Sequence, residues 1–199
     1  MIKALLSVKA LLALLVVYYN SRVPEYLRHE TPAETDDRLK MIVESIDRAC
    51  DEHPLEGWSH DGCVALGVTA AKWESGFLPS VHSGEKRGPS GEVCLFQIHP
   101  GAVAGDPAYR VTREEWLSLP GTDPKSTLAC AVAGIKTLAW HIHRCHFNDE
   151  ERYTAALVFA EYHQPTQTCA AMPSRMSFAR ATDYAKTLKV LRRTERSSR

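Results

Sequence analysis

The sequence has no excess of charge of either sign. Lys+Arg and Asp+Glu each total 24, so the formal net charge is zero. Because proteins that bind nucleic acid usually carry a basic surface, we expect no nucleic-acid partner. The chain also has no internal repeat and no low-complexity segment, and 44% of its residues are hydrophobic, which excludes a disordered chain. Its length fits one compact domain with short extensions.

A long, uninterrupted hydrophobic run is also missing. The most apolar segment, residues 4–19, includes Lys9 and is shorter than the ~20 apolar residues that a membrane-spanning helix normally needs. A basic region followed by a run of leucines is nevertheless typical of a secretory signal. We therefore predict a signal peptide or signal-anchor in residues 1–20, with membrane anchoring through residues 4–19. The alternative is a buried helix of the main domain, which the lack of a polar face disfavours.

Cysteine, by contrast, is well represented, and every cysteine follows the predicted signal. An even number of cysteines behind an export signal indicates disulfide bonds formed in an oxidising compartment. Six cysteines allow fifteen pairings, among which the sequence does not choose, and buried free thiols are the alternative. We expect an exported protein of the periplasm or cell envelope, with a phage virion as the alternative location. The cysteines are Cys50, Cys63, Cys94, Cys130, Cys145 and Cys169.

Apolar residues recur every three to four positions along most of the chain, which predicts a mainly α fold. After a linker at residues 21–34, we expect a domain at residues 35–193 and a basic tail at residues 194–199. Residues 79–124 are rich in glycine and proline, with at most a small β element near residues 80–100. An irregular stretch of this length is often functional. Helices are expected at about residues 35–52, 61–75, 124–146, 149–164 and 174–193.

Glu74 lies at the C-terminal end of an apolar helix, between Trp73 and Phe77. The negative end of the helix dipole and partial burial both disfavour a carboxylate anion, so we expect the pKa of this carboxyl to be raised. A carboxyl group with a raised pKa can act as a general acid at neutral pH. Taken alone, a glutamate at a helix end is more often a plain solvent-facing residue.

The segments that follow Glu74 strengthen the functional interpretation. WESGF at residues 73–77 is followed by CLFQI at residues 94–98 and by AEYH at residues 160–163, near the end of a helix. This order resembles the soluble lytic transglycosylases and, more distantly, goose-type lysozyme, which have Glu-Ser, Gly-Leu-Met-Gln-Ile and Ala-Tyr-Asn. The resemblance covers about residues 39–190, including the final helix around residues 180–184. It implies a lysozyme-like helical fold and cleavage of peptidoglycan glycan strands.

The resemblance implies a role for each matching residue. Glu74 would protonate the leaving glycosidic oxygen and then act as a base. Ser75 would orient the sugar, and Gln97 would hydrogen-bond substrate in the groove. Phe96 would form an apolar wall in place of the family's methionine, and Tyr162 would support the protonation of Glu74.

Three positions depart from the family pattern. Cys94 replaces a glycine, His163 replaces the asparagine that follows the tyrosine, and residues 164–166 read Gln-Pro-Thr instead of Gly-Pro-Gly. His163 is therefore either a simple substitution in the substrate-binding region or a second titrating group. The departures make the third motif the least certain of the three.

The segment WHIHRCH at residues 140–146 has the spacing of a partial metal site. His141 and Cys145 lie one helical turn apart, as do His143 and His146. A zinc site needs three or four ligands, and no CxxC or HExxH partner is present. We therefore expect a disulfide cysteine among surface histidines, with no metal and no cofactor. Cysteine–histidine catalysis is a weaker alternative.

Three functions remain open at this stage. A lytic transglycosylase needs only Glu74, because the muramic 6-hydroxyl attacks internally and a 1,6-anhydro product forms. A muramidase (a hydrolase) needs a second carboxylate, for which Glu85, Glu92 and Asp106 are the candidates. The glycine-rich residues 84–91 predict a mobile rim, which is a poor support for such a base. A non-catalytic wall-binding scaffold is the third possibility, and the oligomeric state stays open.

Overall fold

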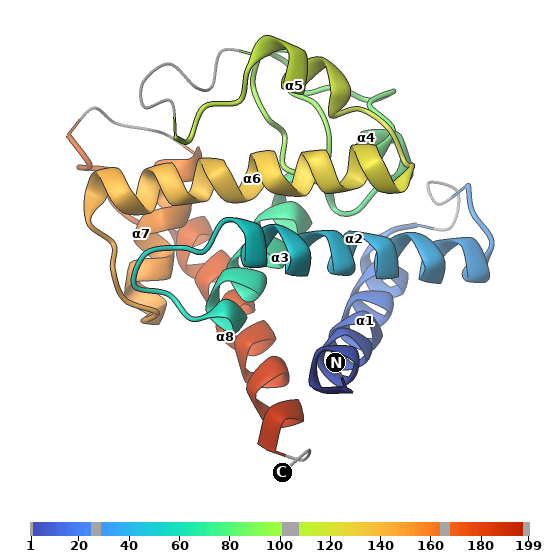
Figure 1. The fold of residues 1–199 in the computed structure, drawn as a ribbon, viewed down its shortest axis with the longest axis horizontal. Coiled ribbons are helices and arrows are strands. Elements are labelled where there is room, and N and C mark those ends of the chain that lie inside the picture. Colours follow the sequence, from blue (N-terminus) through green and yellow to red (C-terminus); the bar gives the residue numbers. More distant parts are fainter. Residues whose placement is uncertain (1, 25–28, 101–107, 164–167, 197–199) are drawn as a thin grey trace.

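The computed structural model describes residues 2–24, 29–100, 108–163 and 168–196, and this part of the chain is mainly helical (Figure 1). Its β structure is one isolated bridge between Val93 and Ile98. Both observations confirm the expected mainly α class with a small β element near residues 80–100. The helices are α1 (Ile2–Arg22), α2 (Pro32–Glu52), α3 (His60–Ser75), α4 (Pro79–His82), α5 (Arg113–Ser118), α6 (Pro124–Cys145), α7 (Arg152–His163) and α8 (Arg175–Arg196).

The central element is α3, which packs against α2, α6 and α8. Its residues 62–71 are all buried, as expected for a helix that is apolar on two sides. Ser59 caps its start, two residues before Asp61, by accepting a hydrogen bond from the Gly62 amide. Gly76 ends it in the left-handed conformation, with φ 59°. The predicted span of this helix is therefore confirmed, although the cap is a different residue.

α2, which packs on α3, begins earlier than the sequence predicts. α2 starts at Pro32 because Thr31 and Glu34 form a capping box, in which each side chain bonds the other residue's backbone amide. The predicted stripe through Leu39, Ile42 and Ile46 is buried as expected. α1 continues to Arg22, so the predicted linker at residues 21–34 is shorter in the structure.

α1 packs along one side on α2 and α8. Leu11, Leu15 and Tyr19 are buried at the same helical spacing, and the guanidinium of Arg38 lies 5.4 Å from the centroid of the Tyr19 ring. In the structure, residues 2–22 thus form a helix of the fold. No helix in the described part of the chain is long and apolar enough to cross a membrane.

The C-terminal half consists of three longer helices with a cover of loops. Asp123 caps α6 through hydrogen bonds to the Lys125 and Ser126 amides, and Pro124 is its first residue, as expected. α5 and residues 83–100 cover the side of α6 that faces away from α2 (Figure 1). α8 packs on α3, α7 and α1, and it extends to Arg196, into the predicted tail.

Three disulfide bonds tie these elements together, which confirms the disulfide prediction. Cys50–Cys63 joins α2 to α3, and Cys94–Cys130 joins the turn at residues 93–98 to α6. Cys145–Cys169 joins the end of α6 to the segment after α7. The bonds enclose 13, 36 and 24 residues, and loop entropy predicts a stabilisation of about 3–4 kcal/mol for each.

Candidate active site

Glu74 is the penultimate residue of α3, and its carboxylate is ion-paired. Nη1 of Arg180 donates to Oε1 of Glu74 at 2.7 Å, and the side chains are 5% and 16% exposed, respectively. Sequence analysis did not identify this partner of Glu74, because Arg180 lies 106 residues away along the chain.

Asp183, one turn after Arg180, holds the residue that precedes Glu74. Its Oδ2 accepts hydrogen bonds from Nε1 of Trp73 at 3.1 Å and from Nζ of Lys72 at 2.8 Å. The Arg180 guanidinium also lies 5.6 Å from the Trp73 ring centroid, within cation–π range. α8 therefore fixes the end of α3 at two successive side chains. Arg180 and Asp183 had been noted only as part of the final helix, so sequence analysis missed both roles.

Tyr162 brings the third motif to the same place. Its hydroxyl donates to the Phe96 carbonyl oxygen at 2.7 Å, which joins α7 to the turn at residues 93–98. Burial raises the pKa of Tyr162 well above its ordinary value, the charge of Glu74 raises it further, and Arg180 opposes both. The structure thus brings Tyr162 near Glu74. Because the hydroxyl proton is committed to Phe96, Tyr162 can offer Glu74 only an oxygen lone pair.

Two residues expected to touch substrate are structural instead. The Ser75 hydroxyl is buried, where it donates to the Ala71 carbonyl at 2.6 Å and accepts from the Phe77 amide at 3.1 Å. Both hydrogen bonds lie within the helix end, so the hydroxyl stabilises that end. Phe96 is fully buried against Gly134, where an added Cβ would lie 2.2 Å from its ring. Phe96 is a core residue, because the glycine leaves room for the ring inside the fold.

Gln97 is half-buried and has a positive φ of 49°. Its Nε2 donates to the Cys94 carbonyl at 3.0 Å, so the side chain braces its own turn. Its Oε1 would lie 2.9 Å from a Cβ at residue 88, which shows why Gly88 fits there. The amide oxygen and the second N–H of Nε2 therefore remain for a substrate bond from Gln97.

The candidates for a second carboxylate differ in their surroundings. Glu85 is exposed, whereas Oε2 of Glu92 accepts a hydrogen bond from the Ser90 amide at 2.9 Å. Asp106 lies outside the residues that the structure describes. The predicted mobile rim contains ordered backbone hydrogen bonds, including Gly88 N–H to the Glu92 carbonyl at 3.0 Å. Glu92 is thus a member of a hydrogen-bonded loop.

A pocket of about 600 Å³ opens beside the end of α3. Two residues of the third motif, Ala160 and His163, face it together with Trp73, and the His163 side chain is exposed. Met172 and Met176 add flexible apolar side chains, and these two residues are 83% and 51% exposed. The other lining residues are Ala171, Ser174, Arg175, Ser177 and Ala179. The pocket adjoins the candidate acid through its neighbour, Trp73.

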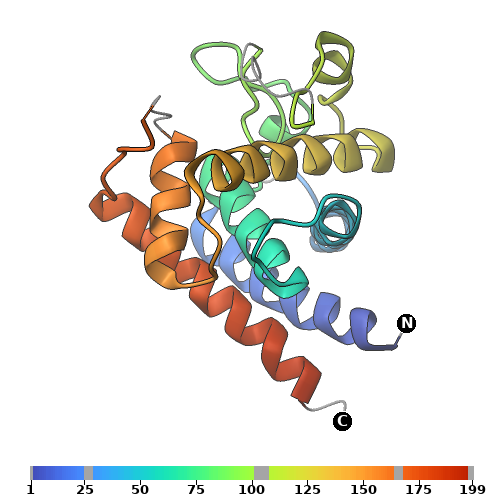
Figure 2. The ribbon, with the colours of Figure 1, turned by 60° about the vertical axis from the view of Figure 1, so that its left-hand side comes forward.

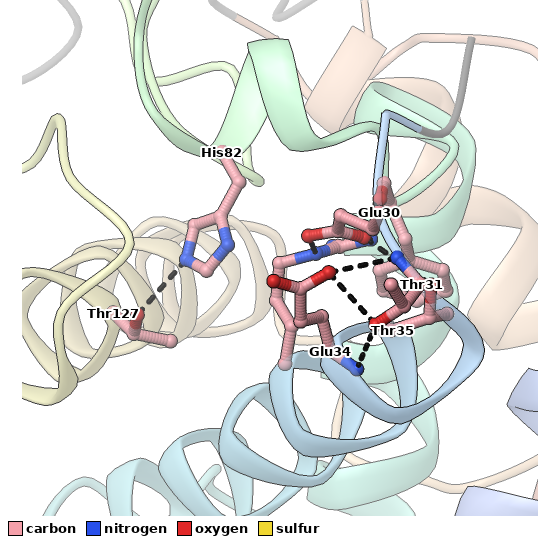
Figure 3. A network of polar contacts seen from close by, with 8 residues as sticks. Glu30, Thr31, Glu34, Thr35, His82 and Thr127 are labelled. Carbon is pink, nitrogen blue, oxygen red and sulfur yellow. Dashed lines mark hydrogen bonds and ion pairs between the residues drawn. The ribbon is translucent and has the colours of Figure 1, made fainter. Parts of the chain in front are cut away.

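A polar network from α2 supports the backbone just after Glu74 (Figure 3). Arg38 is buried, pairs with Glu30 at 2.6 Å and donates from Nη1 to the Phe77 carbonyl at 2.8 Å. Nearby, the fully buried His82 contacts Oγ1 of Thr127 on α6 through Nε2 at 2.9 Å. Burial, followed by the charge of Arg38, lowers the pKa of His82 to about 3, so this imidazole is neutral.

The histidine-rich end of α6 is structural. Cys145 is bonded to Cys169, as expected, so it offers no thiolate to a metal or a substrate. His141 is buried, which corrects the expectation of a surface residue, and burial lowers its pKa to about 4. Glu161, also missed by sequence analysis, is fully buried and accepts hydrogen bonds from Arg144 at 2.8 Å and from the Ala171 amide at 2.9 Å.

Comparisons with known proteins leave the motifs as the basis for any family assignment. No family model, no curated protein and no solved structure matches this chain. The resemblance to the lytic transglycosylases therefore rests on the three short segments and their spacing. What the structure adds is where those segments lie: the Tyr162 hydroxyl bonds the turn at residues 93–98, and Tyr162 lies within electrostatic range of Glu74.

Proposed function

We propose that this protein is a lytic transglycosylase of lysozyme-like fold, which cleaves the β-1,4 bond between N-acetylmuramic acid and N-acetylglucosamine. The observation that carries the proposal is the meeting of Glu74, Tyr162 and the turn at residues 93–98 at one end of a buried helix. A buried carboxyl group beside an open pocket is a suitable general acid. Trp73 supplies an aromatic surface against which a sugar ring can pack.

The reaction requires one carboxyl group that acts twice. Protonated Glu74 donates its proton to the glycosidic oxygen, so the N-acetylglucosamine leaves as an alcohol. The resulting carboxylate then takes the proton of the muramic 6-hydroxyl, whose oxygen bonds to the anomeric carbon. The 1,6-anhydro ring closes and Glu74 is again protonated. No water is consumed, because the nucleophile is already held beside the reacting carbon.

Arg180 and Tyr162 serve the two different protonation states through which Glu74 passes in the proposed reaction. The ion pair with Arg180 stabilises ionised Glu74, which is the form required of the base. We infer that Tyr162, whose pKa the charge of Glu74 raises, supports the protonated form, which is the form required of the acid. The two neighbours thus provide for both states through which the carboxyl group passes.

The surroundings of the other carboxylates favour the transglycosylase over a muramidase. A hydrolytic base must hold a water within hydrogen-bond reach of the sugar. The Glu92 carboxylate already accepts a backbone hydrogen bond, and Glu85 is exposed. An internal hydroxyl nucleophile needs neither group.

The test is Glu74→Gln, assayed on purified sacculi. We expect lysis to fall at least about a hundredfold, because the amide cannot donate or accept the reacting proton. Circular dichroism should be unchanged, since the amide oxygen can still accept from Arg180. Mass spectrometry of wild-type products should find anhydro-muropeptides, each one water lighter than the reducing sugar.

Glu44→Gln is the matched control, because Glu44 is 51% exposed on α2 and should be dispensable. Lysis by Glu74→Gln within twofold of wild type would refute the assignment of the acid. Products with reducing ends alone would instead establish a muramidase. In that case Glu85→Gln, Glu92→Gln and Asp106→Asn would identify the second carboxylate.

A further inference from the structure

α1 has a second, more exposed apolar row beside its buried face, and Leu14 of this row also packs partly on the core. Ala10, Ala13, Leu14 and Val17 follow at helical spacing and are half-exposed or exposed, and Val17 is 69% exposed. Leu11, Leu15 and Tyr19 on the inner face are buried. Fixing α1 in the fold therefore leaves a row of apolar side chains at the surface, which we call the outer row of α1.

α8, which packs beside α1, carries a basic stripe. Lys186, Lys189 and Arg193 are exposed and occur at positions i, i+3 and i+7, which lie on one face of a helix. The Lys186 side chain is 70% exposed, and Arg22 at the end of α1 is also exposed. In both views the start of α1 and the end of α8 lie toward the same side of the molecule (Figure 1, Figure 2).

A groove of about 490 Å³ runs between α1, α3 and α8 and joins the two features. Leu14 and Val17 of the outer row line it, together with Arg22 and Lys186. The acidic residue in this lining is Asp183, which lies 2.8 Å from Lys72 and 3.7 Å from Lys186. Apolar side chains and an excess of positive charge therefore occur together on this surface.

We propose that this surface docks on an anionic lipid bilayer. The outer row of α1 lies at the level of the headgroups, while Arg22 and the basic stripe of α8 contact lipid phosphates. Interfacial helices bind in this way, with affinity from buried apolar area and from attraction to anionic lipids. A lipid surface supplies both partners, whereas an anionic wall polymer would supply only the charge. This inference does not depend on the chemistry of Glu74.

The test is co-sedimentation of the full chain with vesicles. We expect binding to phosphatidylcholine vesicles that contain phosphatidylglycerol and much weaker binding to phosphatidylcholine alone. The double variant Lys186→Gln, Lys189→Gln should bind about 30-fold more weakly, since each cation near such a surface contributes about 1 kcal/mol. High salt should weaken wild-type binding, because the Debye length falls to about 3 Å at 1 M. Val17→Ser should weaken the binding that remains at high salt.

Two control variants match these changes. Lys40→Gln with Arg48→Gln removes the same charge from the exposed side of α2, where the side chains are 54% and 64% exposed. Leu117→Ser replaces a side chain that is 62% exposed on α5. Both should bind like wild type. Equal losses in the control and test variants would overturn the proposal, as would binding to a soluble polyanion from the wall without binding to vesicles.

Discussion

At the scale of single residues, the ion pair between Glu74 and Arg180 has the largest expected effect. Arg180→Met leaves a carboxylate that is 16% exposed without its partner, which should lower the free energy of unfolding by about 3 kcal/mol. Urea unfolding measures this effect.

The control for this prediction is Arg48→Met, which breaks an exposed pair on α2. Arg48 and Glu52 are 64% and 41% exposed, so the change should cost less than about 1 kcal/mol. If Arg180→Met were no more destabilising than this control, the buried pair would contribute no stability.

The buried histidines predict sensitivity to acid. Burial lowers the pKa of His82 to about 3 and of His141 to about 4, so neither binds a proton in the fold near pH 5. Both bind one in the unfolded chain below about pH 6.5. The contribution of each neutral histidine to the free energy of unfolding is therefore fully present above pH 6.5. It should decrease by about 1.4 kcal/mol per pH unit as the pH falls toward the pKa of that histidine in the fold.

Unfolding free energies measured from pH 7 to pH 5 test this expectation. In His82→Gln the slope of the unfolding free energy against pH should be smaller than in wild type by about 1.4 kcal/mol per pH unit, which is the contribution of one proton. His53→Gln is a partly exposed control, with a smaller expected change. Equal slopes for wild type and His82→Gln would show that His82 is protonated in the folded protein.

The residue scale also shows what the sequence could predict of the site. Glu74 and Tyr162 could be placed together, because each lies at a recognisable position near a helix end. The partners Arg180 and Asp183 could not, because helical spacing does not say which distant side chain a helix will face. Ser75 and Phe96 were given substrate roles because a motif carries no information about burial.

At the scale of elements, the predicted helices were those with both an apolar stripe and a cap. α3, α6 and α8 have such signals, and the structure confirms them. α5 was missed because its capping box, Thr112 with Glu115, lies within a stretch rich in glycine and proline. The leucines on all sides of α1 hide which face is packed, because that choice needs tertiary contacts, which a sequence pattern does not contain.

The contact between α6 and the turn at residues 93–98 leaves no room for a side chain at Gly134. Gly134→Ala would place its Cβ 2.2 Å from the Phe96 ring, so the ring and the turn must move. We expect a loss of about 1–3 kcal/mol in the free energy of unfolding. Chemical denaturation measures it, and lysis should fall as well, because Tyr162 bonds the Phe96 carbonyl.

The smaller side chain in Phe96→Leu should rescue Gly134→Ala. The double variant is expected to be more stable than the sum of the single changes, because the two positions share one space. Gly134→Ala as stable as wild type would contradict the close approach. Ala129→Ser on the same helix is the control, since its half-buried position should tolerate a hydroxyl group.

At the scale of the whole molecule, α8 links two regions with different tasks. Its first half lines the pocket and supplies Arg180 and Asp183, which fix the end of α3. Its second half carries the basic stripe beside α1. At 1.5 Å per residue, about 20 Å of rigid helix separate Met176 from Lys189. A bilayer docked at the stripe would leave the pocket open toward a polymer above the membrane.

The two disulfides of α6 have a consequence for when the proposed activity can begin. Cys130 tethers the turn that holds Phe96, and Cys145 tethers the segment whose Ala171 amide binds Glu161. A newly made chain in a reducing compartment would have its helices but not these two tethers. Oxidation after export would then complete the pocket and the acid together. If the protein cleaves peptidoglycan as proposed, that activity would begin only after export.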